Sequence, residues 1–76
     1  MITVLKQTQL ERGRSVRFVT LTELDGEYTV SVHPYKGLGD VDDFDTFTTE
    51  AEGLERFEGW LNLLSMANWV EVGPTV

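Results

Sequence analysis

The chain contains no cysteine and only one histidine, and no apolar run is long enough to cross a bilayer. Without cysteine, neither disulfides nor thiolate metal sites can supplement the core. A chain of 76 residues is close to the smallest size that folds unaided, because such a domain removes only about 60% of its unfolded surface from water. The 41% of apolar residues must therefore hold the fold together. We predict a single domain over residues 1–76.

Basic residues are also scarce. Six Lys and Arg stand against 13 Asp and Glu, which gives a formal net charge of −7. Nucleic-acid binders neutralise phosphates with Lys and Arg, so we expect no direct contact with nucleic acid and favour a basic protein surface as partner. The first ten residues lack the basic start and continuous apolar stretch of a secretory signal. We expect a cytoplasmic protein that makes no membrane contact.

The first half of the sequence is typical of a β-meander. Residues 15–24 and 27–33 flank Asp25 and Gly26, a pair that favours a two-residue type I′ hairpin. This turn gives one apolar face and one hydroxyl-rich face, and a slip by one residue would turn the apolar set outward. The predicted cross-strand pairs are Val19 with Val32, Leu21 with Val30, Glu23 with Tyr28, Thr22 with Thr29, Thr20 with Ser31 and Phe18 with His33.

A second hairpin turn is predicted at Arg12 and Gly13, which makes residues 2–10 the outer strand. Lys6 would then lie opposite Val19, where its stem can cover apolar surface and its ammonium can reach water. After residue 33, proline, glycines and four aspartates interrupt any regular pattern, and we expect an irregular loop up to the start of a helix.

The helix is predicted to run from about residue 50 to 66. Thr49 and Glu52 have the spacing of a capping box. The apolar stripe that follows recurs at helical spacing and should pack on the sheet; it comprises Leu54, Phe57, Leu61 and Leu64, flanked by Trp60 and Leu63. Gly53 and Gly59 are either weak helix positions or, for one of them, a point of close backbone approach.

Residues 69–72 resume a short strand pattern before the chain ends. The predicted order is β-β-β-α-β. We therefore expect the α+β class, with an antiparallel sheet and one amphipathic helix packed on one face. The sequence does not decide where the last strand joins the sheet. We expect Trp60 and Trp69 to close the core.

The net charge is concentrated in one stretch. Residues 40–58 hold eight acidic side chains and one basic residue, Arg56, while the rest of the chain is balanced. Such a surface either docks onto a site rich in Lys and Arg or is a solvated face that confers solubility. Phe44, within this stretch, either anchors the loop to the core or contacts a partner.

The sequence contains few residues suited to catalysis or metal binding. An EF-hand loop starting at Asp40 would place Phe44, Asp45 and Ala51 at positions that require an oxygen ligand, glycine and glutamate. His33 cannot form a multi-histidine site alone, and we expect it exposed or half-buried on the hydroxyl-rich face. No phosphate-binding glycine motif is present. We expect no enzyme activity, no metal and no cofactor.

The acidic segment and the helix after it resemble part of the small phage-encoded anti-CRISPR inhibitors. The resemblance covers under a quarter of the chain; its residues are Asp43-Phe44-Asp45-Thr46, Glu50, Leu54-Glu55 and Trp60. It implies a non-catalytic inhibitor that occupies the basic surface with which a CRISPR effector holds nucleic acid. It also implies a phage gene and the host cytoplasm. The side chains expected to bind the partner are Asp40, Asp42, Asp43, Phe44, Asp45, Glu50, Glu52 and Glu55.

A structural or regulatory interaction module is the alternative. Such a protein would form a homodimer through a sheet edge or through the hydroxyl-rich face. Exposed charge pairs are screened by salt and apolar burial is not, so this association should depend little on salt. Its contacts would come from Phe18, Thr20, Thr22, Thr29 and Ser31.

Overall fold

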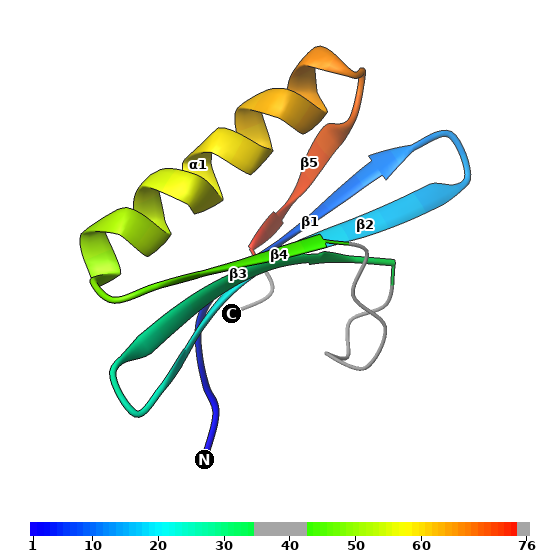
Figure 1. Cartoon of the computed structure of the whole chain (residues 1–76). Coiled ribbons are helices and arrows are strands. Elements are labelled where there is room, and N and C mark those ends of the chain that lie inside the picture. Colours follow the sequence, from blue (N-terminus) through cyan, green and yellow to red (C-terminus); the bar gives the residue numbers. More distant parts are fainter. Residues whose placement is uncertain (35–42, 75–76) are drawn as a thin grey trace.

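The computed structural model describes residues 1–34 and 43–74, which form five antiparallel strands and one helix that covers one face of the sheet (Figure 1). The sheet order is β4-β3-β2-β1-β5. This arrangement confirms the α+β class with one helix packed on an antiparallel sheet. The elements are β1 (Thr3–Arg12), β2 (Ser15–Leu24), β3 (Glu27–His33), β4 (Asp43–Phe47), α1 (Glu50–Met66) and β5 (Val70–Pro74).

The hairpin of β2 and β3 has the predicted turn and register. Asp25 and Gly26 have φ angles of 50° and 82°, which a type I′ turn requires at both central positions. Leu21 pairs with Val30, and both are fully buried beneath α1. The other predicted pairs between these strands are also present.

The hairpin of β1 and β2 differs from the prediction by one turn position. The loop is Gly13 and Arg14, so Arg12 pairs with Ser15 and Gly13 has a φ of 62°. A loop of Arg12 and Gly13 would have required positive φ at an arginine, whereas this loop needs it only at a glycine. The shift keeps the faces from Lys6 to Arg12, and Lys6 lies opposite Leu21 instead of Val19. A register shift between Val4 and Lys6 places Val4 opposite Thr22.

Strand β1 is not the outer strand. β5 pairs antiparallel with β1 between Thr8 and Glu11, which answers where the last strand joins the sheet. Trp69, just before β5, is buried as predicted. The sheet therefore ends at β5 on one side and at β4 on the other.

Residues 43–47 form a strand where we expected irregular loop. β4 pairs antiparallel with β3, with Ser31 opposite Phe44 and Val30 opposite Asp45. The segment has a period-two pattern, in which Phe44 and Thr46 share one face and Phe47 lies on the other. We overlooked this pattern because aspartate is common in loops. Pairing with β3 supplies the hydrogen bonds that favour this extended conformation over the turn propensity of aspartate.

Helix α1 begins and ends where predicted. The Glu52 backbone N–H donates to Thr49 Oγ1 at 3.3 Å, and the Thr49 hydroxyl donates to Glu52 Oε1 at 2.8 Å. Phe57 is the buried centre of the apolar stripe, and Leu63 is 53% exposed and lies outside it. The residues that pack partly buried against the core include Leu54, Trp60, Leu61 and Leu64.

Gly53 is a point of close approach between helix and sheet. A Cβ at this position would lie 2.9 Å from Leu21 Cδ1 and 3.3 Å from Tyr28 Cβ. At Gly59, a Cβ would meet nothing within 4 Å. The alternative of two merely tolerated glycines is therefore wrong for Gly53.

The hydroxyl-rich face of the sheet is largely buried, which corrects our expectation for His33. His33 and Thr20 are both 0% exposed. The His33 Nε2 and Thr20 Oγ1 atoms are 2.7 Å apart, and Gln7 Nε2 donates to Thr20 Oγ1 at 3.0 Å. The Phe18 ring lies 5.8 Å from the His33 ring, centre to centre. These polar groups can be buried because they bond to one another.

Candidate functional site

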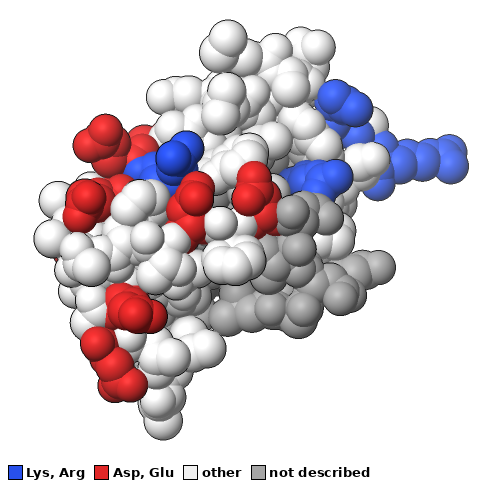
Figure 2. All heavy atoms as spheres, in the orientation of Figure 1, with Lys and Arg blue, Asp and Glu red and all other residues white. Residues whose placement is uncertain are grey.

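Charge is segregated along the surface of the molecule. Figure 2 shows acidic side chains over the start of α1, near the turn between β2 and β3 and in the middle of the view, with a basic side chain among them. Further basic side chains lie toward the hairpin of β1 and β2. The basic end contains Arg12, Arg14 and Arg17. The described part of the acidic stretch, residues 43–58, therefore extends from the start of β4 along the exposed side of α1.

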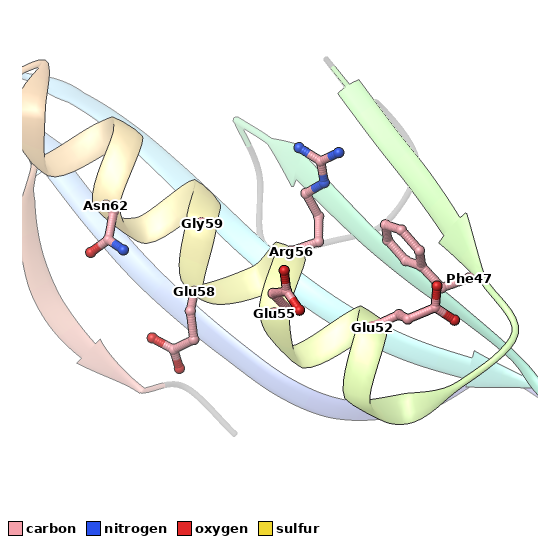
Figure 3. Close-up of a pocket in the computed structure, with 7 residues that line it drawn as sticks. All are labelled: Phe47, Glu52, Glu55, Arg56, Glu58, Gly59 and Asn62. Carbon is pink, nitrogen blue, oxygen red and sulfur yellow. The ribbon is translucent and has the colours of Figure 1, made fainter.

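The exposed side of α1 lines an open depression of about 780 Å³. Residues three apart on a helix lie on the same side, and this places Glu52, Glu55 and Glu58 around the hollow (Figure 3). Gly59 is one of the lining residues, and a Cβ there would meet nothing within 4 Å. Its lining residues are Phe47, Glu52, Glu55, Arg56, Glu58, Gly59 and Asn62.

Two ion pairs connect α1 to the strands on either side. Arg56 Nε lies 3.3 Å from Asp45 Oδ2 on β4, and Lys6 Nζ on β1 lies 3.7 Å from Glu58 Oε1. In Figure 3 the Arg56 side chain accordingly points toward the β4 side of the helix, and Glu58 points away from it. Lys6 Nζ is also 5.2 Å from the centre of the Phe57 ring, and the Lys6 side chain is half exposed.

These ion pairs divide the carboxylates into two kinds. Asp45 and Glu58 are each partly neutralised by a base of the chain itself. Glu50 and Glu52 lie in the first turn of α1, where the positive end of the helix dipole favours a negative charge. Glu55 is exposed on the next turn. The residual negative charge of the depression therefore comes mainly from Glu52 and Glu55.

The structure does not bring all of the predicted site residues together. Asp45 lies on the sheet face that carries α1, and Phe44 lies on the opposite face beside Ser31. Asp43 is the first residue of β4, and Glu50 is the first residue of α1. The length of β4 separates the two side chains, because the four steps from residue 43 to residue 47 of an extended strand span roughly 13 Å. Asp40 and Asp42 lie outside the described residues.

Phe44 contributes to a second, smaller hollow. Phe44 is 62% exposed. Within the described part of the chain, its side chain therefore does not anchor this segment to the core. It lines a depression of about 260 Å³ on the face opposite α1. The exposed apolar side chains Ile2 and Leu24 line the same hollow.

The hydroxyl-rich face offers less contact surface than the homodimer alternative expects. Thr20, Thr22, Ser31 and Phe18 are all less than 9% exposed. Only Thr29 of that predicted set is half-buried, and its hydroxyl lies 3.3 Å from that of Thr46. Four of the five expected contacts are therefore covered.

Sequence reasoning missed several residues that line the larger hollow. Glu58 was counted with the acidic stretch and not assigned to the site, although its spacing from Glu55 already places the two on one helix side. Phe47 stands out in the sequence as an aromatic residue in the acidic stretch, but its place beside the helix follows only from recognising β4 as a strand that leads into α1. Asn62 carries no charge and gave no signal in the sequence.

Residues 1–34 and 43–74 contain no group of three or more His, Asp or Glu side chains placed to hold a metal ion. In the same ranges, no helix is long and apolar enough to cross a membrane. The depression on α1 presents carboxylates, one aromatic ring and the Arg56 guanidinium, which pairs with Asp45. Its remaining carboxylates suit contact with a cationic surface.

Comparisons with protein-family models, with curated proteins and with solved structures found no match to this chain. The resemblance to anti-CRISPR inhibitors therefore stays a prediction.

Proposed function

We propose that this protein is a non-catalytic inhibitor that docks the acidic side of α1 onto a basic, nucleic-acid-binding surface of a partner protein, in the manner of an anti-CRISPR protein. The observation that carries the proposal is the open depression of about 780 Å³ lined by Glu52, Glu55 and Glu58. Lys and Arg side chains of the partner would enter this hollow and pair with carboxylates in place of phosphates. No cofactor takes part.

The attachment of α1 to the rest of the fold supports this proposal. Thr49 fixes the first turn of α1, the core holds Phe57 beneath it, and ion pairs tie both sides of the helix to the sheet. Carboxylates held on such a scaffold lose less conformational freedom on binding than carboxylates on a disordered tail. Complementary charge also accelerates the encounter with a basic partner.

The test is capture of partners from the lysate of a bacterial host, with the wild-type chain and the E52K/E55K variant as paired baits. We expect the wild-type chain to retain a nucleic-acid-binding protein that elutes at moderate salt and no longer binds its nucleic acid. The variant should not retain it. Equal capture by both baits, or capture of only the chain itself, would contradict the proposal.

A self-associating interaction module is the second candidate. The exposed side chains of Ile2, Leu24 and Phe44 around the smaller hollow favour it, because apolar side chains that line one hollow are a common feature of protein interfaces. Sedimentation of the chain alone separates the two candidates. A dimer that is lost in F44S and insensitive to salt would favour self-association.

A further inference from the structure

The outer edge of β4 is the feature of the molecule that the proposed function leaves unused. Among the described strands, β4 pairs only with β3. The other edge of β4 therefore presents backbone N–H and C=O groups that no described strand pairs, and such edges can accept an additional strand from another protein.

The side chains of β4 alternate between two chemically different faces. Asp43 and Asp45 lie on the face that carries α1, opposite Val32 and Val30, and Phe44 lies on the other face. Asp43 and Phe44 are both exposed. A partner that lies flat on either face of the sheet can reach only one of these two groups.

An extended strand alongside β4 reaches both faces at once. Its successive side chains point alternately to the two sides of the sheet. Lys or Arg on one side would meet Asp43 and Asp45, and an apolar residue on the other side would meet Phe44. Asp45 already pairs with Arg56, so Asp43 should contribute more of the attraction.

Charge also disfavours a second copy of β4 as the added strand in two of its antiparallel registers. Antiparallel self-pairing centred on Phe44 would place Asp43 opposite Asp45, and pairing centred on Asp45 would place that carboxylate opposite its own copy. Like charges directly opposite one another destabilise strand pairing.

We propose that the outer edge of β4 binds an extended segment of the partner protein in which Lys or Arg alternates with apolar residues. This rests on the proposed function, since it specifies the kind of segment that the acidic end of the molecule would engage. Main-chain hydrogen bonds to β4 hold the segment, and the side chains on the two faces of β4 select for alternating basic and apolar residues.

The probe is a short fluorescent peptide of alternating Arg and Val, followed by anisotropy at low salt. We expect it to bind about tenfold more tightly than a peptide of the same composition in which all Val precede all Arg. Two further peptides carry N-methyl groups on every second backbone nitrogen, one on the odd and one on the even positions. Alternate N–H groups of an extended peptide point to opposite edges, so only the pattern that blocks the edge facing β4 should weaken binding, by about tenfold. D43K should weaken binding, while E71K on β5, with the same change of charge, should not.

Two results would overturn this inference in different ways. Equal binding of the alternating and block peptides, with no effect of either methylation pattern, would reject pairing with β4 and leave the proposed function standing. If neither peptide binds at low salt, the inference fails, and the proposed function is decided separately by the capture experiment with E52K/E55K.

Discussion

At the scale of the residue, Gly53 shows why α1 can lie close to the sheet. A helix glycine costs about 1 kcal/mol relative to alanine, and here the missing Cβ leaves room for Leu21 Cδ1 and Tyr28 Cβ. Leu21 is fully buried, so its side chain has little freedom to move aside.

Replacing the two helix glycines by alanine should change stability in opposite directions. G53A should lower the free energy of unfolding by about 1 kcal/mol, because overpacking of about 1–3 kcal/mol exceeds the gain in helix propensity. G59A should raise it by about 0.5–1 kcal/mol. Urea denaturation followed by circular dichroism measures both values. A stabilised G53A would show that α1 does not pack as closely as described.

The pairing and burial of single residues could be predicted from the sequence only where a turn already fixed which residues lie opposite one another. The pairing of Leu21 with Val30 followed from one turn and one register. The burial of Thr20 and His33 did not, because a hydroxyl or imidazole on a strand is compatible with either an exposed or a hydrogen-bonded buried site. The bond that joins them is long-range and has no signature in local sequence.

At the scale of the element, the end of α1 is stabilised by another part of the chain. The last turn of α1 contains no basic residue, but Arg12 Nη1 on β1 donates to the carbonyl oxygen of Ala67 at 3.2 Å. The Arg12 guanidinium also lies 5.4 Å from the centre of the Trp69 ring. Arg12 thus supplies a cation at the negative end of the helix dipole and joins the first hairpin to α1.

Removal of this contact should destabilise the fold. We expect R12A to lower the free energy of unfolding by about 1–2 kcal/mol, the sum of a hydrogen bond to a helix terminus and a cation–π contact. The matched variant R14A, in the exposed turn, should change it by less than about 0.5 kcal/mol. Thermal melts of both variants compare the two effects, and equal melting temperatures would contradict the role assigned to Arg12.

Elements could be predicted where pattern and turn chemistry agreed, and not where they conflicted. The capping residue and the spacing of the apolar stripe located α1. The segment 43–47 was missed as a strand because its aspartates favour turns, and only pairing with β3 makes it extended. The turn of the first hairpin was predicted one residue too early, because a glycine can occupy either central position of a two-residue loop.

At the scale of the whole molecule, the proposed docking depends on where the negative charge lies on the surface and not on its total. The sequence located the acidic stretch, and the structure places its described part around α1 and β4. It separates Phe44 from Asp45 by the thickness of the sheet. Sequence could not foresee this separation without recognising the strand. The candidate site is therefore a carboxylate-lined hollow with an adjoining strand edge.

The most direct test of the central claim compares two double variants of equal net charge. Each is titrated against the nucleic-acid complex of the captured partner, and displaced nucleic acid is measured. E52K/E55K reverses charges in the hollow on α1, and E11K/E71K reverses charges on β1 and β5. We expect the first variant to lose at least about tenfold in displacement and the second to match the wild-type chain. Equal loss in both folded variants would show that total charge, and not the acidic side of α1, governs binding.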